Sequence, residues 1–331
     1  MRVLFIGGTG NISRSCAAEA LARGMEVYLY NRGRSAHEPP AGARSIYGDY
    51  ADVSATRRAL EGLRFDAVAQ FIAYTAADVA KDIELFEGRT AQYLFISSAS
   101  VYRKPPSTPF ITESSGLGNR FWQYARDKLA AEELLRAARD ARGFPATVVR
   151  PSHTYSDGWI PTTFGSRDYT VAQRILDGRP IVVHGDGTSL WSLTHADDFA
   201  RAFVGLIGNP DAVGESFHMT TEEILSWDQI HRILAAALGR EARIVHVSSE
   251  AIARVSPERG PSLLGDKAYS MIYDNSKIRR FVPGWSCTVP FHRGIRSSLA
   301  WFDADPRRRL VKPETDREID ELLRRQEAAG A

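Results

Sequence analysis

The sequence predicts an α/β protein, in which a doubly wound parallel sheet carries a smaller, interleaved second lobe. Short apolar runs alternate with helical patterns throughout the first half of the chain, and a glycine-rich loop directly follows the first apolar run. After Arg150 this rhythm gives way to loop-like segments rich in Gly, Pro and Thr. The length of 331 residues is large for one core, so two lobes are expected.

The first half alternates between strand and helix patterns. A strand, a helix and a second strand in succession usually form a right-handed parallel unit, and repeated units build a sheet covered on both faces. The predicted strands are Val3–Ile6, Glu26–Tyr30, Arg44–Tyr47, Ala67–Phe71, Tyr93–Ile96 and Ala146–Val149, and the predicted helices include Ser13–Arg23, Val53–Leu63 and Trp122–Arg142.

The second half contains fewer regular elements. It shows helical patterns at Tyr169–Leu176 and Trp227–Leu238, followed by a strand at Arg243–Val247. Two short apolar runs, Leu193–His195 and Glu215–Met219, are expected to return to the main sheet, so the second lobe interrupts the first.

These patterns divide the chain as follows. Residues 1–155, with 190–222 returning, form the first lobe, while 156–189 and 223–312 form the second and 313–331 a helical tail. The tail places Ile319, Leu322 and Leu323 on one helical face, which would pack against the body or against a second subunit in a homodimer.

The composition limits the possible functions. The chain is 44% hydrophobic and 25% charged, with a net charge of +2, so nothing suggests a nucleic-acid or membrane surface. No apolar run reaches the roughly 18 residues of a membrane-spanning helix. The only cysteines, Cys16 and Cys287, lie far apart. We therefore expect a cytoplasmic protein without a disulfide framework or a metal site.

The glycine-rich loop lies between the first strand and the first helix. Gly7 permits a tight turn, and Gly10 lets a phosphate approach the backbone, while Asn11 and Ile12 open the helix. A helix N-terminus offers unpaired N–H groups and a positive dipole end. The loop therefore predicts a dinucleotide site in a Rossmann-type domain.

The end of the second strand bears on which dinucleotide binds. An acidic residue there would bond the ribose 2′-hydroxyl and repel a 2′-phosphate. The chain has Asn31, Arg32 and Arg34 instead, which favours NADP slightly and leaves NAD open. The arginines could equally be solvated loop residues.

A tyrosine and a lysine lie four residues apart on one predicted helical face. Lys128, together with the positive charge of an oxidised nicotinamide, would favour the phenolate of Tyr124 and so make the phenol a usable base. Upstream, Ser98 follows an apolar strand, at the sheet edge where α/β proteins bind ligands. Its hydroxyl could orient a substrate oxygen beside Tyr124.

The glycine loop, Ser98, Tyr124 and Lys128 together resemble the extended short-chain dehydrogenases/reductases, the NAD-dependent epimerase/dehydratase family. The resemblance continues through Arg150-Pro151-Ser152-His153, Gly185-Asp186-Gly187-Thr188, Asp197-Asp198-Phe199 and Asp274-Asn275-Ser276-Lys277-Ile278. It implies that Tyr124 takes the hydroxyl proton, Lys128 holds the cofactor ribose and Ser98 positions the oxygen. It also implies further cofactor contacts at Asp49, Tyr50, Ala73 and Pro151, and substrate contacts at Tyr74, Ser100, Tyr102, His153 and Trp191.

The chain departs from the family pattern in the substrate half. Ala99 and Ser100 stand where many dehydratases carry Asp-Glu, although His153 or Glu113 could supply a base. His153 replaces the usual asparagine, and Trp191 replaces a pyrophosphate-binding arginine. Either Arg120 or Arg293 holds a diphosphate or the substrate carries none. Trp191 could also be a core residue.

The expected function is NAD(P)-dependent oxidation of a sugar-ring hydroxyl with hydride return, as in an epimerase or dehydratase. The substrate would be a sugar nucleotide, nucleoside or glycoside. A simple NADP-dependent dehydrogenase or reductase is the alternative within the class. A non-catalytic dinucleotide sensor or RNA-binding scaffold is the alternative outside it, and the presence of Ser98, Tyr124 and Lys128 favours the enzyme.

Overall fold

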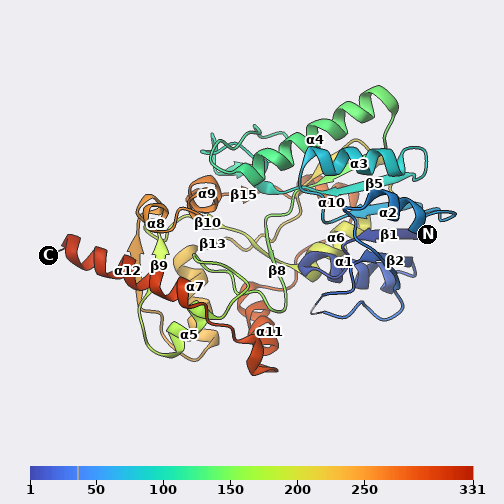
Figure 1. Cartoon of the computed structure of the whole chain (residues 1–331). Helices are drawn as coiled ribbons and strands as arrows, with labels where there is room; N and C mark the ends of the chain where they lie inside the picture. Colours follow the sequence, from blue (N-terminus) through green and yellow to red (C-terminus); the bar gives the residue numbers. More distant parts are fainter. Residues whose placement is uncertain (36, 331) are drawn as a thin grey trace.

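The computed structural model describes residues 1–35 and 37–330 (Figure 1). It contains a parallel sheet of seven strands in the order β12-β7-β5-β4-β1-β2-β3. Every neighbouring pair in this sheet runs parallel. The strands are β1 Arg2–Ile6, β2 Glu26–Asn31, β3 Arg44–Tyr47, β4 Ala67–Gln70, β5 Gln92–Ile96, β7 Ala146–Val149 and β12 Ser216–Phe217.

Helices cover both faces of the sheet. Side chains of β1 alternate, so that Val3 and Phe5 pack in one apolar cluster and Leu4 and Ile6 in another. The first cluster includes α1 and α6, and the second lies under α3 and α4. This confirms the doubly wound α/β prediction. The helices are α1 Asn11–Ala22, α2 Val53–Ala59, α3 Ala76–Phe86, α4 Gln123–Arg142 and α6 Ala196–Leu206.

The helix ends follow local chemistry. α4 ends where Gly143 adopts a φ of 68°, which glycine tolerates without a Cβ penalty. The segment expected to be helical through Leu63 stops at Ala59, because the chain turns over Leu60–Leu63 with Gly62 at a φ of 72°.

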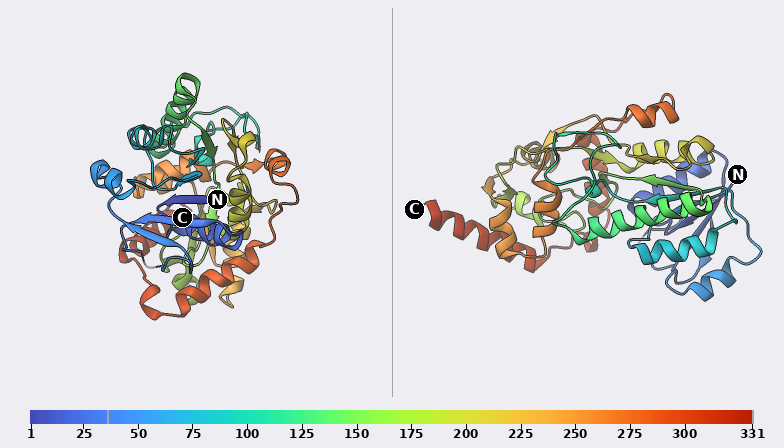
Figure 2. Two further views of the ribbon diagram at one scale, coloured as in Figure 1. Left: turned by 90° about the vertical axis from the view of Figure 1, so that its right-hand side faces the viewer. Right: turned by 90° about the horizontal axis from the view of Figure 1, so that it is seen from above.

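The second lobe has its own apolar core around the fully buried Trp227. It lies at the far end of the molecule from the N-terminus (Figure 2). Short strand pairs and helices surround this core: β9 Ile181–His184 with β14 Ile244–Val247, β10 Leu190–Trp191 with β13 Leu225–Ser226, α5 Thr170–Leu176, α7 Trp227–Ala237, α8 Ser249–Val255, α9 Gly260–Ser262 and α11 Phe291–Asp303. Three further elements follow from the structure: β15 Ile272–Tyr273 pairs with β6 Phe110–Ile111, and α10 Ser276–Phe281 packs against α6.

One predicted strand pairing is wrong. β11 Leu193–His195 does not return to the main sheet but pairs in parallel with β8 His153–Tyr155. Of the two runs expected to return, only Ser216–Phe217 joins it, beside β7. The strand β8 thus leads the chain out of the first lobe, and β11 accompanies it on the way back.

The C-terminal helix, α12 Pro313–Gly330, packs against the body of the protein. Ile319 and Leu322 are buried in the second-lobe core, as one reading of the apolar stripe predicts. The buried Arg174 fixes the helix through ion pairs with Asp316 and Asp320. Among the described residues, no helix is both long and apolar enough to cross a bilayer.

Candidate active site

A cleft runs along the carboxyl ends of the central strands. It consists of two adjoining cavities of about 430 and 610 Å³. Both are lined by Gly7, Gly10, Ile72, Tyr74 and Arg167. Ligands of open α/β sheets bind at this edge, so the cleft is the expected place for a cofactor and a substrate.

The glycine loop provides a cradle in which a side chain would not fit. Gly7 has a φ of +89°, and a Cβ on it would lie 2.4 Å from Ile72 Cγ2. Ser13 ties the loop together: its hydroxyl donates to Gly7 O at 2.7 Å and accepts from Gly10 N at 2.9 Å. The backbone therefore faces the cleft at the N-terminus of α1, as a pyrophosphate requires.

Asn11 joins this loop to the strand that leads into the second lobe. Its side-chain amide donates to Thr154 O at 2.8 Å, and its carbonyl accepts from the Ser156 hydroxyl. Asn11 and its neighbour Ile12 both line the cavity that also contains the catalytic candidates.

The other cavity contains the residues expected to bind the adenosine half. Asn31, Arg32 and Arg34 line it, together with Asp49 and Tyr50. The buried Nδ2 of Asn31 has no hydrogen-bond partner among the described residues, so it is available to a ribose oxygen.

The hydroxyl of Tyr50 is engaged in a hydrogen bond within the protein. Its hydroxyl donates to the buried Asp82, which also accepts from Tyr93. A ligand would therefore meet the side of the Tyr50 ring rather than a free hydroxyl. Together, the backbone cradle and the orphaned Asn31 amide fit a dinucleotide.

Ser98, Tyr124 and Lys128 line the same cavity as the glycine loop. Tyr124 lies one turn before Lys128 on α4, and Ser98 caps the 3₁₀ turn Ala99–Val101 that follows β5. The Ser98 hydroxyl accepts from Ser100 Oγ at 2.9 Å. The structure thus brings the three predicted catalytic residues together.

A buried ion pair fixes α4 against the sheet. Glu132, one turn after Lys128, accepts from Arg150 Nη2 at 2.7 Å and from the Ser97 hydroxyl. Both partners of the pair are almost fully buried. Because Ser97 follows β5 and Arg150 follows β7, this contact sets the distance between the helix and the two strand ends.

Burial dominates the electrostatics of the catalytic pair. It raises the pKa of Tyr124 to about 12, although an interaction with Ser98 acts in the opposite direction. It also lowers the pKa of Lys128 to about 7. Desolvation thus sets the pKa of Tyr124, and the phenol is protonated at neutral pH. The expectation that Lys128 and an oxidised nicotinamide together favour the phenolate stays a prediction.

Lys128 is held in place by two main-chain carbonyls. Its Nζ donates to Ala73 O and to Ile96 O, each at 2.7 Å, and lies 4.7 Å from the centre of the Tyr74 ring. Ala73 is buried beneath the cleft and orients the lysine, whereas Pro151 lines the cavity itself.

The substrate half has aromatic walls. Tyr74, Ser100, His153 and Trp191 all line it, as predicted. The His153 and Trp191 rings lie 5.8 Å apart, and burial lowers the pKa of His153 to about 3. A histidine with so low a pKa binds a proton weakly, so His153 stays neutral and is a poor candidate for the base of an elimination.

Trp191 is both a core residue and part of the cavity wall, the two positions considered for it from the sequence. Its ring packs against Trp227 in the second-lobe core, with centroids 5.0 Å apart, and its indole N–H donates to Tyr269 O at 3.2 Å. The remaining edge faces the cavity.

Tyr102 does not reach the cavity. The 3₁₀ turn directs it inward, where it is fully buried and its hydroxyl bonds His218 Nδ1 at 3.0 Å. His218 Nε2 donates to the main-chain oxygen of Asp274, so Nδ1 accepts the Tyr102 proton. The substrate contact predicted for Tyr102 is therefore not supported by its position.

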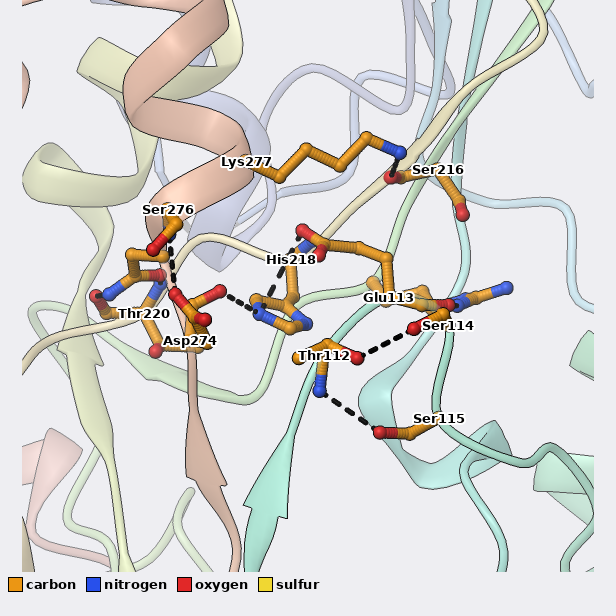
Figure 3. Close-up of polar contacts among 12 residues, drawn as sticks. Thr112, Glu113, Ser114, Ser115, Ser216, His218, Thr220, Asp274, Ser276 and Lys277 are labelled. Atoms are coloured by element: carbon orange, nitrogen blue, oxygen red, sulfur yellow. Dashed lines mark hydrogen bonds and ion pairs between the residues drawn. The ribbon is translucent and has the colours of Figure 1, made fainter.

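Glu113 also lies away from the cavity. It accepts from the main-chain N–H of His218 at 3.3 Å, in a separate polar cluster beside Asp274 (Figure 3). It cannot serve as the alternative base from there. Arg120 and Arg293, considered as diphosphate ligands, likewise do not line either cavity of the cleft.

Several cavity residues carried no signal in the sequence. Asp266 lines the substrate half beside the buried Lys104, whose Nζ lies 3.2 Å from Asp266 Oδ1, and burial raises its pKa. Its short segment between α9 and β15 belongs to no motif. Others that were missed are Trp122, Trp159, Arg167 and Tyr273.

The comparisons with known proteins agree with this geometry. The chain is 28% identical over 285 residues to 2′-dehydrokanamycin reductase of Streptomyces kanamyceticus, covering 86% of this chain and 80% of that protein. It is 26% identical over 336 residues to the chloroplast stem-loop binding protein of 41 kDa b of Arabidopsis thaliana, covering 97% and 84%.

The fold matches solved structures of the same kind. UDP-glucose 4-epimerase of Thermotoga maritima, solved with UDP-glucose, superimposes with a TM-score of 0.74 at 18% identity over 92% of this chain and 99% of that one. A model of the NAD dependent epimerase/dehydratase family matches residues 3–219. The chain therefore belongs to the NAD-dependent epimerase/dehydratase family and is an enzyme of this type.

Proposed function

We propose that the protein catalyses NAD(P)-dependent hydride transfer at a hydroxyl-bearing ring carbon of a sugar-like substrate, with hydride return as in an epimerase. The observation that carries this proposal is a single cavity lined by both the glycine loop and Ser98, Tyr124 and Lys128. A dinucleotide held by the loop and a substrate held by the walls would share that space.

The roles follow from position. A bound nicotinamide supplies the site that accepts and returns hydride. Tyr124 exchanges a proton with the substrate oxygen, and Ser98 holds that oxygen in place. Lys128 lies behind the tyrosine, where it can turn from the Ala73 and Ile96 carbonyls toward a cofactor ribose.

A second candidate is net reduction of a keto sugar. It is favoured by the pKa of Tyr124, which at about 12 leaves the phenol protonated and ready to donate to a forming alkoxide. Dehydration is disfavoured, because Ala99 and Ser100 offer no acid–base pair, burial makes His153 a weak base and Glu113 lies outside the cavity.

We further propose a substrate with little or no phosphate charge, such as a nucleoside or glycoside. Trp191 and the neutral His153 form a wall that cannot compensate a desolvated diphosphate. NADP is the proposed cofactor, a cytoplasmic location is proposed, and no nucleic acid is expected as a partner.

The cofactor carried by the purified protein tests the main proposal. A tightly held dinucleotide that stays with the protein through gel filtration supports hydride return, while an empty protein that consumes added NADPH with a keto sugar supports net reduction. Failure to bind either NAD+ or NADP+ would refute both.

Competition binding tests the substrate class. The site contains Trp122, Trp159 and Trp191, so quenching of tryptophan fluorescence reports its occupation. Micromolar binding of UDP-glucose without any response to uridine or kanamycin would contradict the uncharged substrate.

A further inference from the structure

Arg167 is the one arginine that lines both cavities of the cleft, within the part of the chain that the structure describes. It belongs to the second lobe, on the segment between β8 and α5. Arg32 and Arg34, by contrast, line only the adenosine half. Arg167 therefore lies where the two cavities join, whereas Arg32 and Arg34 lie where they could bind a 2′-phosphate.

The neighbouring contacts fix the segment that presents Arg167. A tight turn precedes it, in which Gly165 O accepts from Thr162 N at 3.0 Å and from the Thr162 hydroxyl at 2.8 Å. The Arg167 guanidinium carbon lies 4.7 Å from the centre of the Trp159 ring. This cation–π contact holds the guanidinium over the ring at the cavity wall, and its N–H donors make no hydrogen bond within the described residues.

The charge of Arg167 has no partner within the described residues. The adjacent Asp168 is engaged elsewhere, since it caps α5 through Thr170 N at 3.0 Å and lies 3.4 Å from Lys312 Nζ. Arg167 itself is exposed and makes neither an ion pair nor a hydrogen bond among those residues. A guanidinium at a cavity junction, without a carboxylate, is suited to an anion from a ligand.

The glycine loop points to the same anion. Gly7 and Gly10 line both cavities with Arg167, and they present the N-terminus of the twelve-residue helix α1. Backbone N–H groups and a forked cation that line the same space are both suited to the oxygens of a diphosphate.

We propose that Arg167 binds the pyrophosphate of the dinucleotide together with the glycine loop, so that the cofactor site is completed by the second lobe. This inference rests on the dinucleotide site of the proposed function. A sugar nucleotide carries the same diphosphate chemistry. The shared lining by Gly7 and Gly10 assigns Arg167 to the cofactor.

Calorimetric titration of cofactor-free protein with NAD+ and with ADP-ribose tests the assignment. Arg167→Gln is expected to weaken both by about tenfold, as for loss of one charge-assisted contact. Arg167→Lys should recover part of the loss, because it keeps the charge and loses the fork. Arg120→Gln is the matched control, since that arginine is exposed and stacks on Phe121 outside the cleft.

The source of the diphosphate is tested with UDP-glucose added to protein saturated with NAD+. The uncharged substrate proposed above predicts little UDP-glucose binding to either the wild type or Arg167→Gln. Binding of UDP-glucose that is lost in Arg167→Gln while the NAD+ affinity is kept would overturn the cofactor assignment. If the wild type binds NAD+ and ADP-ribose and Arg167→Gln binds them with the same affinity, the cofactor assignment is also overturned. A wild type that binds no dinucleotide refutes the proposed function instead. Because Arg167 is exposed, we expect Arg167→Gln to unfold at the same urea concentration as the wild type, which would show that the variant is folded.

Discussion

Replacing Gly7 with alanine probes the cradle on which the dinucleotide site depends. Two separate strains meet at this residue. Its φ of +89° is unfavourable for any residue with a Cβ, and the new Cβ would lie 2.4 Å from Ile72 Cγ2. The chain offers controls in which each strain occurs alone.

Gly24 isolates the backbone strain, because its φ is +76° and a Cβ there would meet nothing within 4 Å. We expect Gly24→Ala to lower the free energy of unfolding by about 1 kcal/mol. Gly8 isolates the clash, since its Cβ would lie 2.4 Å from Leu29 Cδ2 without a positive φ. Leu29 is fully buried and cannot move aside, so Gly8→Ala should cost about 2–3 kcal/mol.

We expect the loss of stability in Gly7→Ala to lie between the cost of the backbone strain alone and the sum of the backbone and clash costs. Ile72 is 39% exposed and can shift, which reduces the clash, so we expect a total cost of about 2 kcal/mol. Urea unfolding of the three variants measures these costs. Calorimetry with NAD+ should show a weakened Gly7→Ala and an unchanged Gly24→Ala. If Gly7→Ala bound NAD+ normally and lost no more stability than Gly24→Ala, the cradle would be irrelevant to the cofactor.

Substitutions at three other positions test the site and the buried ion pair that supports it. Tyr124→Phe preserves the ring packing against Trp122 and should lower the rate by about a hundredfold or more with unchanged dinucleotide affinity, whereas near wild-type turnover would remove the phenol from the mechanism. In the wild type, oxidation should accelerate with rising pH because it needs the phenolate. Arg32→Gln should weaken NADP+ more than NAD+ in titrations, and equal losses would leave the arginine a surface residue. Glu132→Ala strands the buried Arg150 charge and should cost about 3–5 kcal/mol in urea unfolding, with Glu132→Gln milder; a cost below about 1 kcal/mol would contradict the importance of the pair.

The parallel sheet and its cofactor loop could be predicted because their signals are local. β1 is apolar at nearly every position, as a strand buried on both faces must be, and Gly7 and Gly10 follow it at once. Ser98, Tyr124 and Lys128 were found because they occur with fixed spacings. Their meeting in one cavity needed only that β5 and α4 be neighbours.

The failures share a tertiary origin. The three residues of β11 are too few to show a period, so nothing in them distinguished β8 from the main sheet as a partner. Tyr102 follows the serine motif, but the turn that Ser98 caps rotates it into the core. Asp266 and Arg167 come from irregular segments of the second lobe, and only the packing of that lobe brings them to the cleft.

The bond between Asn11 and β8, the strand that leads into the second lobe, has a consequence for how such enzymes can diversify. The acceptor at Thr154 is a main-chain carbonyl, so any residue could occupy that position and still receive the bond. Beyond that strand, side chains add to the joint: the Ser156 hydroxyl donates to Asn11, and Arg14 lies 3.4 Å from Asp157. A new lobe grafted beyond this strand would inherit a working attachment to the cofactor loop from its backbone alone. Specificity can thus be exchanged while the joint remains intact.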